Sequence, residues 1–187
     1  MCGRFMFEPK KNPEINRIYE LATDNGYQPK TGEVFPSDQT ALVIPGEEQV
    51  KVVAMKWGFP GFKPGQLIIN ARSETVKEKK MFASSFKARR CVYPTSGFFE
   101  WSQDKEKYWF NYGEAPEPLY IGGFYNVFQG TLQSILLTTA PNQSVATIHN
   151  RMPLILKKDQ IKPWLNNDEF ANQFLTAAMP TLSSRSV

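Results

Sequence analysis

The chain begins Met1-Cys2-Gly3-Arg4, which places a cysteine directly behind the initiator methionine. Because cysteine is small, removal of Met1 would leave Cys2 as the mature N-terminus. That residue would carry an α-amine and a thiol on adjacent carbons, a pair that no internal residue has. A frayed terminus that tolerates any residue would explain the same cysteine. The other polar residues of the sequence decide between these two interpretations.

Three further clusters place polar side chains where a plain hydrophobic core does not need them. They are "INARSET", "GFFEW" and "IHNRMP", which hold Asn70, Glu100 and His149 respectively. His149 is the only histidine, so any chemistry that needs an imidazole must use it. The two cysteines, Cys2 and Cys91, have neither a disulfide framework nor zinc-finger spacing. We therefore expect no metal site.

Each cluster also has a structural interpretation. Asn70 would cap a following helix. Glu100 would face outward from an alternating strand, although its aromatic neighbours break the alternation and leave a partly buried carboxyl open. His149 would lie in a surface turn. Cys91 and Trp57 would be ordinary core residues.

Length and composition favour one soluble domain. The 187 residues are 41% hydrophobic and 13% aromatic, enough for a real core. We expect residues 1–187 to form a single domain with a short flexible tail from about residue 180. No apolar stretch is long enough for a membrane span, and no signal peptide is visible. The expected protein is a monomer, cytoplasmic and not bound to membranes.

The elements that position the clusters follow from hydrophobic periodicity and from Gly and Pro. Asn12-Pro13 begins a capped amphipathic helix. The pattern predicts a hairpin at 41–44 and 50–55, a loop at 56–65, helices at 73–89, 161–165 and 168–178, and strands at 67–69, 91–93, 98–102, 108–112, 119–128 and 133–138. This order indicates an α+β fold with a largely antiparallel, barrel-like sheet and peripheral helices.

Four ordered motifs resemble one family. "MCGRF", "NARSET", "RRCVYPTSGFFEW" and "IHNRMPLIL" run from the first residue to Leu156. Together they are similar to the SRAP family, the SOS response-associated peptidase-like proteins that process abasic sites in DNA. Two departures stand out. Thr95-Ser96 occupy the place of the usual Ala-Asp, and the shortened "WGFPGF" loop has Phe62 where a second tryptophan is common.

The resemblance implies that Cys2 is an abasic-site sensor. A ring-opened abasic site in single-stranded DNA bears an aldehyde, which an amine converts to a Schiff base. The neighbouring thiol then closes a thiazolidine ring, leaving a covalent DNA–protein crosslink. An α-amine has an ordinary pKa of about 7.7–8.0, so far more of it is neutral at pH 7 than of a lysine. The resemblance also implies AP lyase activity and self-removal of Met1. It implies no cofactor.

The family roles extend to the other motif residues. Asn70 would hold the N-terminal residue, Glu100 would shuttle protons, and His149 would act as acid or base on the sugar. The net charge of +4 is a mild basic bias that fits a narrow phosphate-binding groove. The candidate DNA contacts are Arg4, Arg72 and Arg151 for phosphates and Pro36 and Trp57 for bases.

Two other classes of protein stay open. One is an N-terminal-nucleophile peptidase in which Cys2 performs hydrolysis. The other is a non-catalytic single-stranded DNA-binding module in which Cys2 has no chemical role. An aldehyde-dependent covalent adduct would separate the crosslinking protein from both.

Overall fold

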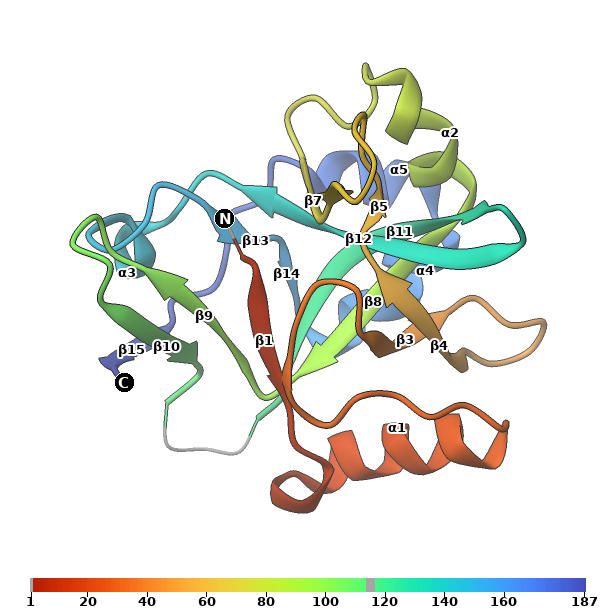
Figure 1. Cartoon of the computed structure of the whole chain (residues 1–187), viewed down its shortest axis with the longest axis horizontal. Coiled ribbons are helices and arrows are strands. Elements are labelled where there is room, and N and C mark those ends of the chain that lie inside the picture. Colours follow the sequence, from red (N-terminus) through yellow and green to blue (C-terminus); the bar gives the residue numbers. More distant parts are fainter. Residues whose placement is uncertain (1, 114–116) are drawn as a thin grey trace.

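The computed structural model describes residues 2–113 and 117–187, and five strands of this part of the chain close into a barrel (Figure 1). The order is β12-β4-β3-β8-β11, and β11 pairs with β12 to complete the ring. Only the β12–β4 contact is parallel among these pairs. The predicted α+β fold with a largely antiparallel, barrel-like sheet is confirmed. The barrel strands are β3 (Gln39–Ile44), β4 (Lys51–Trp57), β8 (Arg90–Thr95), β11 (Leu119–Phe128) and β12 (Thr131–Thr139).

Large side chains fill the barrel, and a glycine permits its closure. Tyr93 on β8 and its partner Ile121 on β11 are fully buried on one face of the wall, as the inward positions of a small barrel require, whereas Phe124 lies on the other face of β11 and packs against Phe82 and Phe86. On β11, a Cβ at Gly123 would lie 2.5 Å from the carbonyl oxygen of Ile135 and 2.7 Å from the Tyr93 ring. Strands β11 and β12 can therefore approach closely at Gly123 because it has no side chain.

A second sheet carries the N-terminal segment and Glu100. Its order is β15-β10-β9-β1-β2. The C-terminal segment, which the sequence predicts to be a flexible tail, contains β15, and β15 pairs with β10 along four residues. The strands are β1 (Arg4–Phe7), β2 (Gly32–Val34), β9 (Gly97–Trp101), β10 (Lys107–Asn111) and β15 (Ser183–Ser186).

Short strands bring distant segments to the end of β12. β7 pairs in parallel with Leu136–Thr138, while β13 pairs antiparallel at Thr138 and Thr139. The expected 56–65 loop is partly strand, since β4 continues to Trp57 and β5 pairs with β6. These strands are β5 (Phe59–Pro60), β6 (Leu67–Ile68), β7 (Asn70–Arg72), β13 (Met152–Pro153) and β14 (Ile155–Leu156).

Helices cover the outside, with α1 and α2 at opposite ends of the view (Figure 1). The Asn12 side chain caps α1 by accepting from two amides, as predicted. The helix expected at 73–89 is shorter, because the Ser73 amide donates to Thr138 of β12 and residues 73–78 form turns. No helix in the described ranges is long and apolar enough to cross a membrane. The helices are η1 (Pro9–Lys11), α1 (Pro13–Asp24), α2 (Lys80–Ala88), α3 (Gln143–Ala146), η2 (Lys158–Gln160), α4 (Ile161–Asn166) and α5 (Asp168–Phe174).

Candidate active site around Cys2

Cys2 is held between the two sheets. β1 pairs with β9 so that Arg4 lies opposite Phe99, and the same register extended by one step places Gly3 opposite Glu100. Cys2 is fully buried. Its carbonyl oxygen accepts a hydrogen bond of 2.9 Å from the side-chain amide of Asn70 on β7. Met1, whose removal the sequence predicts, lies outside the described residues.

Asn70 therefore lies beside Cys2 and caps no helix. It belongs to β7, and α2 begins only at Lys80. Its Nδ2 is used by Cys2, whereas its Oδ1 is buried without a hydrogen-bond partner among the described residues. A buried acceptor is costly to leave unpaired. The amide thus offers an oxygen next to the main chain of Cys2.

Glu100 and His149 lie next to each other at the site. Glu100 is only 2% exposed, so the outward-facing interpretation is wrong. Its Oε2 lies 3.7 Å from Nε2 of His149. Burial raises the pKa of Glu100, and the charge of His149 opposes part of this rise. A carboxyl with a raised pKa can both donate and accept a proton closer to neutral pH.

The thiol of Cys2 is influenced by the same carboxyl. Burial raises the pKa of the Cys2 thiol, and the negative charge of Glu100 raises it further. The structure thus brings Cys2, Asn70, Glu100 and His149 together from four separate segments. At neutral pH this environment favours the protonated thiol over the thiolate.

His149 lies in the short connection between α3 and β13. Its Nδ1 is 3.1 Å from both the main-chain nitrogen and the carbonyl oxygen of Arg151. A pocket of about 500 Å³ lies beside this connection, lined by Trp101–Asp104 and Ala146–Asn150. The pocket therefore borders His149 from the side of these two loops.

The arginines differ in what they contact. Arg151 binds both carboxylate oxygens of Glu74, at 2.6 and 2.9 Å, and its side chain is only 13% exposed. A phosphate would have to displace Glu74 to reach it. The side chain of Arg72 is exposed and makes no hydrogen bond or ion pair of its own within the described part of the chain, although its carbonyl accepts from the Thr75 amide. It is therefore open to an external anion.

Arg4 lies in a patch of charged and aromatic side chains. Its guanidinium carbon is 4.3 Å from the Phe35 ring centroid and 5.1 Å from that of Trp101. Arg4 and Lys107 both contact Oε1 of Glu33, at 3.3 and 2.8 Å. The sequence reasoning missed Lys107, Glu33 and Phe35, because only the pairing of β1 with β2 and of β9 with β10 brings them to Arg4.

The prediction that Trp57 stacks on DNA bases is wrong for this structure. Trp57 is fully buried, its ring centroid lies 5.2 Å from that of Phe5, and its Nε1 donates to the carbonyl of Ile69. It is a core residue because it ends β4 instead of lying on a loop. Phe62, on the connection between β5 and β6, is 85% exposed, and Pro36 lies in a turn as expected.

The departure at Thr95 has a structural explanation. The Thr95 hydroxyl lies 2.7 Å from the carbonyl oxygen of Met6 and 2.6 Å from that of Gly97, and it accepts from the Gly97 amide. These contacts tie the turn between β8 and β9 to β1. The hydroxyl therefore supports the strand that carries Cys2.

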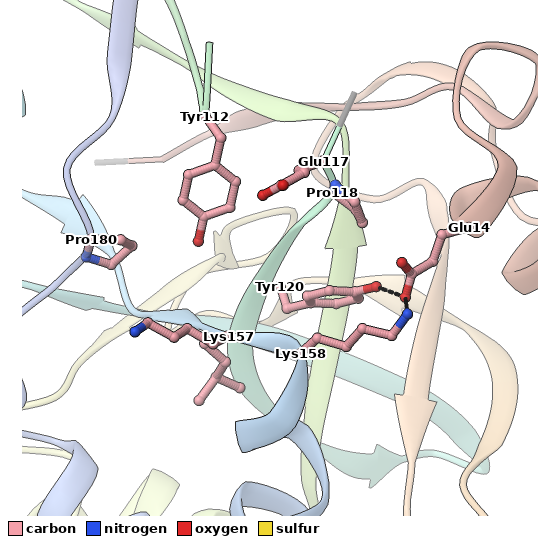
Figure 2. Close-up of a pocket in the computed structure, with 9 residues that line it drawn as sticks. Glu14, Tyr112, Glu117, Pro118, Tyr120, Lys157, Lys158 and Pro180 are labelled. Carbon is pink, nitrogen blue, oxygen red and sulfur yellow. Dashed lines mark hydrogen bonds and ion pairs between the residues drawn. The ribbon is translucent and has the colours of Figure 1, made fainter. Parts of the chain in front are cut away.

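A different pocket of about 500 Å³ lies apart from the residues of this site. Figure 2 shows Glu14 in this pocket with the Tyr120 hydroxyl and the Lys158 amine both directed at its carboxylate. These contacts join α1 to β11 and η2. Within residues 2–113 and 117–187, no group of three or more His, Cys, Asp or Glu side chains could hold a metal ion.

Comparison with known proteins identifies the family of this chain. The family model described as SOS response associated peptidase (SRAP) matches residues 1–186, so the chain belongs to the SRAP family. It is 30% identical to the abasic site processing protein YoaM of Bacillus subtilis (strain 168), covering 96% of this chain and 85% of YoaM. It is 26% identical to the abasic site processing protein YedK of Escherichia coli (strain K12), covering 90% and 81%.

Solved structures share the fold. A protein from Bordetella bronchiseptica superposes with a TM-score of 0.79 at 20% identity, covering 100% of this chain and 99% of that one. A protein from Bacteroides thetaiotaomicron superposes with a TM-score of 0.76 at 19% identity, covering 100% and 92%. The barrel with its second sheet is thus a fold that distant sequences share.

Proposed function

We propose that this chain processes abasic sites in single-stranded DNA by forming a thiazolidine crosslink through the mature Cys2. The relatives named as abasic site processing proteins supply the substrate class. The main observation is the arrangement at the N-terminus. Asn70 holds the carbonyl of Cys2, and the charge of the buried Glu100, paired with His149, acts on its thiol.

The reaction balances with the residues at hand. The neutral α-amine of Cys2 adds to the aldehyde to give a carbinolamine, which loses water to form an iminium ion. The thiol sulfur then attacks the iminium carbon, and the thiol proton leaves. The products are the ring-closed adduct and one water molecule. No cofactor takes part in this sequence.

Glu100 is the proposed proton carrier. The thiol of Cys2 is protonated at neutral pH because burial and Glu100 raise its pKa, so the amine attacks first. Dehydration needs an acid, and ring closure needs a base for the thiol proton. A buried carboxyl with a raised pKa serves both steps, donating first and accepting afterwards.

His149 is the proposed acid or base on the sugar. A Schiff base withdraws electrons from the sugar carbon, so removal of the neighbouring C2′ proton expels the 3′ phosphate and cuts the strand. The imidazole lies beside the 500 Å³ pocket, where a sugar could approach it. AP lyase activity therefore belongs to the proposal as the competing fate of the Schiff base.

DNA would be held by the exposed Arg72 and by Arg4, which is half-buried and paired with Glu33. Arg72 lies two residues after Asn70 on the same strand and is exposed, and Arg4 lies two residues after Cys2. We assign these two arginines to phosphates on either side of the lesion. Pro36 and the exposed Phe62 replace Trp57 as the surfaces for bases, where stacking typically contributes about 1–3 kcal/mol per base.

The alternatives gain less support. A cysteine peptidase needs a thiolate, and the surroundings of Cys2 disfavour it. Self-removal of Met1 is the peptidase step that we retain in the proposal. A non-catalytic binding module would not need a buried carboxyl–imidazole pair beside the N-terminus.

The test uses the purified protein after its intact mass has been measured, which establishes whether Met1 is absent. It is incubated with a single-stranded oligonucleotide that contains one abasic site. The matched control is the same oligonucleotide after borohydride reduction, which turns the aldehyde into an alcohol. With the unreduced abasic oligonucleotide we expect an adduct that survives denaturing electrophoresis, and with the reduced control we expect none. Equal adduct formation with both substrates, or crosslinking by protein that retains Met1, would exclude the mechanism.

A further inference from the structure

The ion pair between Glu74 and Arg151 joins three segments around the site. Glu74 follows β7, and its carboxylate receives both terminal nitrogens of Arg151. The Nη2 atom of Arg151 also donates to the carbonyl oxygen of Thr138 on β12, at 2.7 Å. The same carbonyl accepts the amide of Ser73, at 2.8 Å. The arginine therefore anchors its own segment to β12 and to the turn after β7.

The main chain of this anchored arginine contacts His149. Nδ1 of the imidazole lies 3.1 Å from the amide nitrogen and 3.1 Å from the carbonyl oxygen of Arg151. When Nδ1 carries no proton, it accepts from the amide, and the proton of the neutral ring is on Nε2 facing Glu100. When the ring gains a second proton, Nδ1–H can donate to the carbonyl. The main chain of one residue can thus serve both protonation states without a ring flip.

We infer that Glu74 and Arg151 are positioning residues, which hold the 149–151 turn so that the neutral His149 keeps its proton on Nε2, towards Glu100. The inference rests on the proposed function for the work that His149 does. The positioning itself is a property of the protein without DNA. It gives Arg151 a different role from the phosphate contact that the motif resemblance predicts.

Several features distinguish this ion pair from an ordinary surface pair. The contact has two parallel hydrogen bonds, which fix orientation better than a single one. The Arg151 side chain is largely buried, whereas Glu74 remains 46% exposed. The pairing lowers the pKa of Glu74, chiefly through its hydrogen bonds with Arg151, so the carboxylate stays charged in mildly acidic solution. Substitution of Glu74 therefore removes the anchor without opening the core.

The test uses the fact that His149 is the only histidine. Protein labelled with histidine that carries ¹⁵N in the ring alone gives signals from two nitrogens, and long-range proton–nitrogen correlation shows which one carries the proton. The variant is Glu74→Gln, which keeps the shape and removes the charge. The control is Glu78→Gln, an exposed glutamate of the same segment. Circular dichroism checks that both variants are folded.

We expect the wild type and Glu78→Gln to show the neutral ring protonated on Nε2 alone. Glu74→Gln should show a mixture of the two tautomers. Its rate of strand cleavage, the step assigned to His149, should fall about 10–100-fold, the loss typical when a residue that orients a functional histidine is removed. Arg151→Lys keeps the charge but loses the two-pronged contact, so it should shift the tautomers in the same direction.

Unchanged tautomer populations in folded Glu74→Gln would overturn the inference. If DNA affinity rose at the same time, Arg151 would instead be a phosphate ligand that Glu74 masks. Should Glu74→Gln fail to fold, the same readout on Arg151→Lys decides. Failure of the proposed function is recognised separately, because the wild type would then form no adduct with the abasic oligonucleotide. The tautomer populations are measured without DNA, so they test the positioning role independently of that result.

Discussion

At the scale of single residues, the site combines a cysteine thiol whose raised pKa disfavours the thiolate with a carboxyl whose raised pKa suits proton transfer. Burial and Glu100 both raise the pKa of the Cys2 thiol, and burial raises that of Glu100 itself. Two physical effects act here: removing a group from water penalises its charged form, and the negative charge of Glu100 further disfavours a thiolate beside it. The order of events in the proposed reaction, amine before thiol, follows from this environment.

Replacing the reactive thiol separates the two covalent steps. Cys2→Ala keeps the α-amine but cannot close the ring, so the durable crosslink should disappear while a Schiff base trapped by borohydride remains. Cys91→Ala is the matched control, because Cys91 is the other cysteine and lies buried in the barrel wall. Denaturing electrophoresis with and without borohydride measures both species. A Cys2→Ala crosslink as durable as that of wild type would contradict the thiazolidine.

Substitutions of Glu100 and His149 should impair different steps of the reaction. Glu100→Gln should slow crosslinking in single-turnover reactions while DNA affinity is kept, because it removes the proton carrier. His149→Ala should mainly lower strand cleavage, with some crosslink still accumulating. General acid–base roles are worth about 10²–10⁴-fold in rate, so the losses should exceed assay error. Wild-type rates in both folded variants would show that neither side chain takes part in the chemistry.

The raised pKa of Glu100 also predicts a pH dependence of stability. The folded protein holds this proton more tightly than the unfolded chain does, so stability falls as pH rises from the ordinary glutamate pKa of about 4.3 towards the raised folded value. Glu100→Gln should therefore gain thermal stability relative to wild type with increasing pH. Melting temperatures across this range measure it, with Glu78→Gln as the control. A constant difference between the two proteins would mean that the pKa of Glu100 is the same in the folded and the unfolded chain.

At the scale of elements, the side-chain cap of α1 stabilises the start of one helix, so its removal should lower the stability of the protein by a limited amount. Asn12 Oδ1 accepts from the amides of Glu14 and Ile15, so Asn12→Ala should lower the free energy of unfolding by about 1 kcal/mol. Asn16→Ala on the same helix is the control, since its side chain makes only an exposed contact with Glu20. Urea unfolding compares them. Equal destabilisation by the two substitutions would show that the cap contributes nothing.

At the scale of the whole molecule, a net charge of +4 makes local placement of cations decisive for DNA binding. Arg72→Ala should weaken binding to all single-stranded sequences alike and reduce the slope of log K against log salt by about 0.7. Arg17→Ala on α1, also exposed, should leave the slope unchanged. Titrations at several salt concentrations decide this. An unaltered slope for Arg72→Ala would remove it from the DNA contacts.

The sequence by itself determined the features that depend on neighbouring residues. Asn12-Pro13 and the apolar spacing after it specify α1, and Pro45-Gly46 between two β-branched runs specifies the β3–β4 hairpin. The motifs around Cys2, Asn70, Glu100 and His149 were visible because polar residues interrupt apolar runs. Cap chemistry, turn preference and periodicity act within a few residues, so they can be read directly from the chain.

Only the tertiary structure decided which of these residues meet and which are buried. Asn70 and the His149 segment come together because β7 and β13 both pair with the end of β12, a contact between segments far apart in sequence. Trp57 lies inside because β4 extends through it, and Arg151 is engaged because Glu74 reaches it from another segment. Strand pairing and burial depend on the packing of the whole chain, and a local pattern does not contain that information.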